Sequence, residues 1–133
     1  MSHNTLRVGI QDPIIAYWQA EHPTTPIYFE NCTKEPDSDF LLCVIDFGDT
    51  SQASIGSTTH LYRKIAAIRY ILVTKSETTN SKYDSYLDTL EEIKTKRKIT
   101  IALLRDFQNH GRTAKGDSNE TIITQVFQYD KNL

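Results

Sequence analysis

Cysteine is scarce in this chain of 133 residues, which contains only Cys32 and Cys43. Cys43 lies within an apolar, strand-like run, so we predict a small buried side chain there rather than half of a disulfide. With no second pair of cysteines and no recognisable secretion signal, the sequence argues against a disulfide framework. None of the four histidines stands at a metal-ligand spacing from another histidine or a cysteine, so neither a metal nor another cofactor is expected.

Long apolar runs and an excess of basic charge are also missing. The longest apolar run spans residues 40–45, far short of the ~20 residues that a bilayer span requires, so no membrane contact is expected. Fifteen Lys and Arg stand against 17 Asp and Glu, which argues against a dedicated nucleic-acid binder. A hydrophobic fraction of 38% is sufficient for one core. We therefore expect one soluble domain over residues 1–133.

Prolines are confined to the first 36 residues, where an apolar stripe predicts a helix. The stripe repeats every four residues and consists of Leu6, Ile10, Ile14 and Trp18. Asp12 and Pro13 interrupt it, either as an N-cap with a first-turn proline or as a kink within a longer helix. Pro23 and Pro26 then end the helix.

The remaining pattern predicts an α+β fold, with a mainly antiparallel sheet of four to five strands covered by two helices. Strands are expected at residues 27–29, 40–47, 61–74, 99–104 and 121–129, a helix at 81–97, and a flexible loop at 111–119. Ser81 and Asp84 resemble a capping box at the start of that helix. The residues expected in the core are Trp18, Phe40, Leu42, Val44, Ile68, Tyr70, Leu87, Leu90 and Val126.

Catalytic motifs are absent from the sequence, so no enzyme is expected. Asp46 and Asp49 stand close together at a strand end, where they could bind a metal or act as acid and base. The simpler interpretation is a strand end followed by a turn. Arg63 and Arg69 share a strand face and could bind an anion, or could form a solvated or subunit-facing edge. Basic residues at 94–98 either contact nucleic acid or complement the helix dipole.

One segment, residues 48–57, is longer than a tight hairpin needs. It is rich in small and hydroxyl-bearing residues, and Ile55 is its only bulky apolar residue. It is either a long surface loop or an extended arm that pairs with a neighbouring chain and places Ile55 in a pocket there.

A set of short motifs in this order resembles the tail terminator (tail completion) proteins of long-tailed bacteriophages of the lambda type. The motifs are a helix with Trp18 near its end, Pro26-Ile27-Tyr28-Phe29-Glu30-Asn31, Gly48-Asp49, Gln52-Ala53-Ser54-Ile55-Gly56-Ser57, Tyr62-Arg63 and a final Phe127-Gln128-Tyr129. The family often has Trp where Phe29 stands and a glycine near the positions of Ile65 and Ala66. The resemblance spans most of residues 6–130.

This resemblance implies a structural virion protein that forms a ring, a hexamer in the lambda type. The ring would cap the tail tube, end its polymerisation and provide the joint to the head connector. The expected partners are other copies of the chain, the tail tube protein and the head-tail connector protein, while DNA only passes through the lumen. The protein would lie at the head-proximal end of the tail of a phage or prophage, after assembly in the host cytoplasm.

The residues expected at the subunit or tube interface lie in or next to the arm: Asp49, Gln52, Ser54, Ile55, Gly56, Tyr62 and Arg63. Arg63 is expected to bond a carboxylate of the adjacent subunit. Three alternatives remain. The protein could be a head-tail connector or minor tail protein of the same assembly, or a small metal-dependent nuclease that uses Asp46 and Asp49. It could also be a monomeric binding module with residues 48–57 as its ligand loop.

Overall fold

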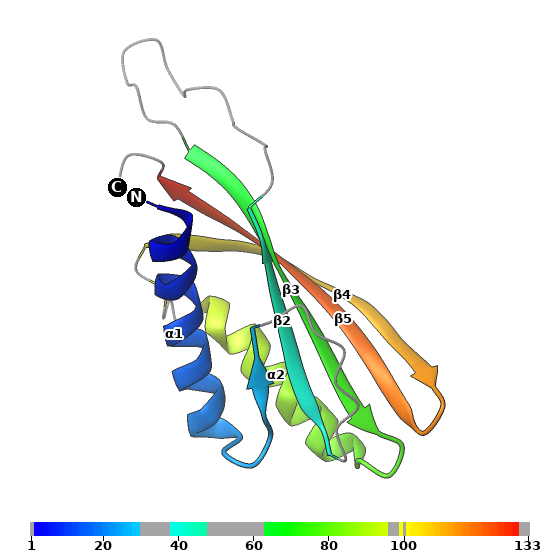
Figure 1. Cartoon of the computed structure of the whole chain (residues 1–133). Helices are drawn as coiled ribbons and strands as arrows, with labels where there is room; N and C mark the ends of the chain where they lie inside the picture. Colours follow the sequence, from blue (N-terminus) through cyan, green and yellow to red (C-terminus); the bar gives the residue numbers. More distant parts are fainter. Residues whose placement is uncertain (1, 30–37, 48–62, 96–98, 100, 131–133) are drawn as a thin grey trace, which may run out of the picture.

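Two helices and five strands follow one another in the order that the sequence predicts. The computed structural model describes residues 2–29, 38–47, 63–95, 99 and 101–130. The elements are α1 (His3–Glu21), β1 (Ile27–Tyr28), β2 (Phe40–Asp46), β3 (Arg63–Lys75), α2 (Asn80–Thr95), β4 (Ala102–Lys115) and β5 (Ser118–Asp130). Both helices lie on one side of the sheet (Figure 1), which confirms the predicted α+β fold.

The five strands form one mixed sheet in the order β1-β2-β3-β5-β4. Only β1 is parallel to its neighbour, with Ile27 opposite Leu41, and the other pairs are antiparallel. β3 and β5 pair over their whole length, from Arg63 opposite Asp130 to Lys75 opposite Ser118. The sheet is therefore mainly antiparallel, as expected, with β3 and β5 at its centre.

Helix α1 buries the four stripe residues that the sequence identified, Leu6, Ile10, Ile14 and Trp18. The helix begins well before Asp12, because Ser2 Oγ caps it by accepting a hydrogen bond of 3.1 Å from Thr5 N. Pro13 therefore lies inside the helix, and the alternative of an N-cap at Asp12 is wrong. Gly9 lies close to Ile101 in the fold, since a Cβ at this position would come within 2.3 Å of Ile101 Cδ1.

Side chains alternate between the two faces of the sheet, and only one face meets the helices. On β2 the residues facing the helices are Leu41, Cys43 and Ile45, all of them buried. Cys43 is thus the buried apolar residue that the sequence predicts, and burial raises the pKa of its thiol well above the usual value.

Five of the predicted core residues are buried, namely Trp18, Phe40, Ile68, Tyr70 and Leu90. The four others are half-buried, namely Leu42, Val44, Leu87 and Val126. Leu42, Val44 and Val126 lie on the sheet face that the helices do not cover, because the helices meet the other face only. Leu87 lies on α2 and packs against the edge of the core.

Two local predictions are also wrong. The expected flexible loop at 111–119 is mostly strand, because β4 continues to Lys115 and β5 starts at Ser118. The turn between them contains Gly116, whose φ of +61° is easy for glycine and strained for most other residues. Helix α2 starts at Asn80 rather than at a Ser81 cap, and Thr79 Oγ1 accepts a hydrogen bond of 3.3 Å from Lys82 N.

Candidate functional site

Six of the seven predicted interface residues lie outside the described residues: Asp49, Gln52, Ser54, Ile55, Gly56 and Tyr62. The seventh, Arg63, is the first residue of β3, and its backbone stands opposite Asp130 of β5. The structure thus places residues 48–62 between β2 and β3, two adjacent antiparallel strands of the sheet.

Phe47 fixes the start of this segment against the C-terminal strand. Its ring meets the rings of Phe127 and Tyr129 at centroid distances of 6.4 Å and 6.2 Å, both nearly perpendicular. Edge-to-face pairs of this kind are favourable beyond the area that they bury. Phe127 is completely buried, so Phe47 packs against the core at the end of this described stretch.

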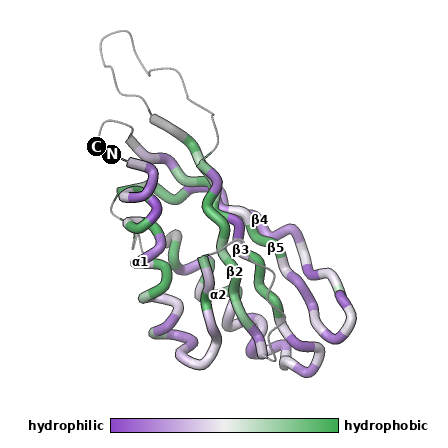
Figure 2. The backbone as a smooth tube through the Cα atoms, in the orientation of Figure 1, coloured by the Kyte–Doolittle hydropathy of each residue, from purple (hydrophilic) through white to green (hydrophobic). Residues whose placement is uncertain are grey.

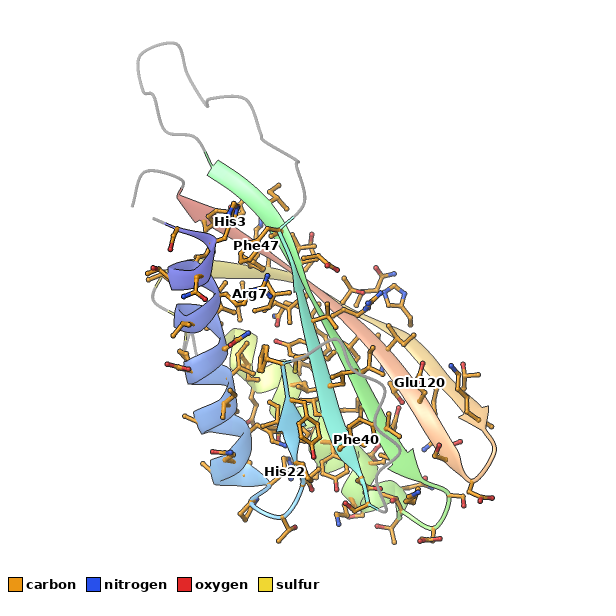
Figure 3. The ribbon with its side chains drawn as sticks, viewed as in Figure 1. His3, Arg7, His22, Phe40, Phe47 and Glu120 are labelled. Carbon is orange, nitrogen blue, oxygen red and sulfur yellow. The ribbon has the colours of Figure 1, made fainter. Side chains whose placement is uncertain are left out.

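The first turn of α1 holds Phe47 from another direction (Figure 3). The Arg7 guanidinium lies 4.9 Å from the centre of the Phe47 ring, and the His3 ring is 5.1 Å away. Arg7 Nη1 also donates a hydrogen bond of 3.4 Å to the carbonyl oxygen of Ile45. This end of β2 is therefore tied to both α1 and β5.

The Asp46 and Asp49 pair is only partly described. Asp46 is the last residue of β2, is exposed, and stands opposite Ala67, while Asp49 lies outside the described residues. Among the residues that the structure describes, no group of three His, Cys, Asp or Glu side chains could hold a metal ion. Asp46 therefore belongs to no such group of three within the described residues.

Arg63 and Arg69 do share a face of β3, but they stand six residues apart. At ~3.3 Å per residue, their backbones are separated by about 20 Å. The side chain of Arg63 lies outside the described residues, so a joint anion site stays a prediction. Arg69 stands exposed at the middle of the sheet face that looks away from the helices.

We call this surface the open sheet face. Within the described part of the chain, no helix covers it (Figure 2). Its central residues are half-buried, with Arg69 as the exposed exception, and comprise Leu42 and Val44 of β2, Ala67, Arg69, Ile71 and Val73 of β3, and Ile122, Thr124 and Val126 of β5. Most of them are apolar.

The strand register arranges these side chains in rows across the sheet. Leu42, Ile71 and Ile122 stand in one row. In the next row, Arg69 stands between Val44 and Thr124. The face therefore has an apolar surface with one cation near its centre, a composition typical of surfaces that contact other proteins.

A second cluster, between the end of α1 and α2, was not predicted from the sequence. Here the His22 ring packs against both Trp18 and Tyr86, at centroid distances of 4.6 Å and 4.8 Å, and these two rings also contact each other at 5.5 Å. His22 Nε2 is 2.7 Å from Thr89 Oγ1, and Trp18 Nε1 donates a hydrogen bond of 3.0 Å to the carbonyl oxygen of Thr25. Burial lowers the pKa of His22 from its usual value.

Asp39 completes the polar part of this cluster. Its carboxylate accepts hydrogen bonds from Lys75 N at 2.8 Å, from the Thr78 hydroxyl at 2.8 Å and from the Tyr86 hydroxyl at 3.0 Å. Because these donors belong to the protein itself, Asp39 joins the end of β3 to α2 and has a structural role. The partners of Asp39 lie too far along the chain to be read from spacing.

Comparisons with known proteins bear on the fold. No protein-family model matches the chain, and no curated protein matches it in sequence. Twenty-one chains of solved structures match it. One of them, whose name describes no function, covers 97% of this chain and 96% of its own length, with a TM-score of 0.65 and 13% identity. At that identity the likeness shows a shared fold alone.

In the part of the chain that the structure describes, no helix has the length and hydropathy needed to cross a bilayer.

Proposed function

We propose that this chain is a structural tail terminator protein of a phage or prophage, which assembles into a ring on the tail tube. The observation that carries the proposal is the length of chain between the end of β2 at Asp46 and the start of β3 at Arg63. β2 and β3 are antiparallel neighbours, and a connection of two to five residues is the common way to join such strands. The segment between them is much longer and contains the Gln52–Ser57 motif that resembles the family.

The packing around Phe47 supports an arm at this position. Phe47, the last described residue before this segment, is tied to α1 through Arg7 and to β5 through Phe127. A segment that starts from a rigid base can reach a neighbouring chain with less loss of conformational entropy than one that starts from a loop. Ile55 then provides the apolar anchor in the neighbour.

The proposed ring acts by geometry rather than by chemistry. Head-to-tail contacts between identical subunits close into a ring when the rotation allows it. A closed ring on the last layer of the tail tube covers the surface that would accept another layer, and so ends polymerisation. Its opposite surface then meets the head connector, and DNA passes through the lumen. The proposed partners are therefore copies of this chain, the tube protein and the connector protein.

Electron microscopy of the purified protein, alone and mixed with tail tubes, tests this function. We expect rings alone and capped tube ends in the mixture. Ile55→Asp should abolish both while leaving the melting temperature unchanged, because a charge is forced into an apolar contact between subunits. The matched control is Ala114→Asp, which places the same charge on an exposed residue of the β4–β5 hairpin.

Several outcomes would contradict the proposal. A variant Ile55→Asp that unfolds would place Ile55 in the core of its own subunit, and one that still caps tubes would remove the role of the arm. Binding to connectors but not to tubes would favour a head-tail connector protein. DNA cleavage with magnesium or manganese that is lost in Asp46→Ala or Asp49→Ala would favour a nuclease.

A further inference from the structure

Two large apolar side chains are exposed among the described residues, and they lie on opposite layers of the subunit. They are Val8, which is 44% exposed, and Leu103, which is 52% exposed. Val8 belongs to α1 in the helical layer. Leu103 stands opposite Gln128 of β5, which stands opposite Ile65 of β3, so Leu103 extends the open sheet face. Each layer thus presents apolar surface to solvent.

The outward side of α1 forms a short ridge. Val8, Asp12 and Ala16 are all exposed and follow one another at four-residue intervals, so they stand one above the other on the helix. No described residue bonds to the Asp12 carboxylate in an ion pair or hydrogen bond. This α1 ridge is a surface of small and apolar side chains, and the Asp12 carboxylate at its centre has no partner among the described residues.

The open sheet face has the complementary arrangement. Arg69 is exposed near its centre, with Val44 and Thr124 beside it in its row and the apolar row of Ile71 next to it. The guanidinium of Arg69 has no ion-pair partner in the described part of the chain. An anion on an apolar ridge therefore fits this face both in charge and in hydrophobic character.

Charge is also separated between the two layers as a whole. The two helices carry three Lys or Arg and six Asp or Glu. The strands carry seven Lys or Arg and four Asp or Glu. Two copies stacked with a helical layer on a sheet layer attract one another, while two copies joined by the same layer repel. The charge pattern favours a head-to-tail contact.

Other surfaces fit a second copy less well. β4 is one of the two edge strands of the described sheet, and it carries two irregularities in its pairing with β5, with the charged residues Arg105 and Asp106 at the first of them. Bulges and charges on an edge oppose pairing with another chain. The outward side of α2 presents Asp84, Asp88 and Glu91, all exposed, and thus lacks the apolar surface that the sheet face would require.

We propose that copies of this chain associate head to tail, with the α1 ridge of one copy seated on the open sheet face of the next. Asp12 of the first copy pairs with Arg69 of the second, and Val8 enters the surrounding apolar surface. This inference rests on the proposed function, since it assigns the surface through which the subunits of the ring meet.

A charge exchange tests this contact in the full-length protein. Native mass spectrometry and analytical ultracentrifugation are applied to the wild type, Arg69→Asp, Asp12→Arg and the double variant. Each single variant places like charges together, and should weaken association by about tenfold or more. The double variant restores opposite charges and should recover most of the association. Circular dichroism should give the same melting temperature for all four, because both side chains are exposed.

Matched controls separate this contact from a general effect of charge. Arg105→Asp and Asp88→Arg make the same changes at exposed residues outside the two surfaces, and should leave assembly unchanged. The proposed contact would be overturned if Arg69→Asp assembled like the wild type. It would also be overturned if a single variant lost assembly and the double variant did not recover it. Neither result would contradict the proposal that the wild type forms a ring. If Arg69→Asp bound DNA more weakly than the wild type while its assembly was unchanged, that result would also overturn the contact. A wild type that stays monomeric at high concentration would contradict the ring itself.

Discussion

The Tyr70 hydroxyl donates a hydrogen bond of 3.0 Å to Gln125 Oε1, and both side chains are completely buried. They lie on the adjacent strands β3 and β5, on the face that meets the helices. Gln125 Nε2 finds no partner among the described residues. The pair is thus a polar contact within an apolar core, and burial raises the pKa of Tyr70 well above its usual value.

Tyr70→Phe should lower the free energy of unfolding by about 1–3 kcal/mol, because it leaves the Gln125 oxygen buried without its donor. In a Gln125→Leu background the same change should be neutral or stabilising, because the hydroxyl has no acceptor there. Urea denaturation of the four proteins measures the coupling. If Tyr70→Phe lowered the unfolding free energy equally in the wild type and in Gln125→Leu, the hydrogen bond would contribute nothing to stability.

Gly116 in the β4–β5 turn has a φ of +61°, and no atom lies within 4 Å of the position that a Cβ would take. The effect of a side chain there is therefore confined to backbone strain. Gly116→Ala should lower the free energy of unfolding by roughly 1–2 kcal/mol. Gly116→Asn should lower it less, because asparagine tolerates this conformation better. Equal effects of the two variants in thermal or urea unfolding would contradict this explanation.

The same hairpin shows where sequence patterns stop being informative. The stripe from Leu6 to Trp18 predicts α1 because its buried side demands apolar residues at helical spacing. Most side chains of β4 beyond Leu104 are exposed and polar, so no alternation marks them. Their strand is held by backbone pairing to β5, which composition does not reveal. The predicted strand therefore ends at residue 104, eleven residues before Lys115.

Leu90 and Leu87 of α2 form a natural comparison, because the first is completely buried and the second is half-buried. Leu90→Ala should lower the free energy of unfolding by ~2–5 kcal/mol, through lost burial and the cavity that remains. Leu87→Ala should have a clearly smaller effect, since fewer atoms lose contacts. Urea denaturation gives both free energies, when the two variants are fitted with the same dependence of unfolding free energy on urea concentration. A change below about half a kcal/mol for Leu90→Ala would be typical of a surface position and would contradict the helix assignment.

The candidate site was predicted only in part, for a geometric reason. Arg69 is visible in the sequence as a cation within an apolar strand, but its surroundings depend on which side of the sheet the helices cover. Likewise, Asp39 bonds to Lys75 N and to Tyr86 across 36 and 47 residues of sequence. Contacts of that range are created by the fold, and no local spacing encodes them.

His22 provides a test of the polar cluster between α1 and α2. Thr89 Oγ1 donates its own hydrogen to the carbonyl oxygen of Ser85 at 3.0 Å, so it accepts a hydrogen bond from His22 Nε2. This pattern assigns the proton of the neutral ring to Nε2. Desolvation lowers the pKa of His22 from 6.5 and Lys82 adds to this, while Glu21 and the Ser85 carbonyl act in the opposite sense. The lowered value means that the fold favours the neutral ring.

This preference sets the direction of the pH dependence. Because the folded state binds the proton less readily than the unfolded state, the contribution of His22 is complete above pH 6.5 and is lost as the pH falls toward its lowered pKa. His22→Gln removes the titration and keeps an N–H donor for Thr89. It should therefore flatten the decline in unfolding free energy between about pH 7.5 and 5, measured by urea denaturation at several pH values. His110→Gln removes an exposed ring and controls for the loss of one histidine. If the unfolding free energies of His22→Gln and the wild type decline with the same slope as the pH falls, the packing of His22 against Trp18 and Tyr86 does not determine its protonation.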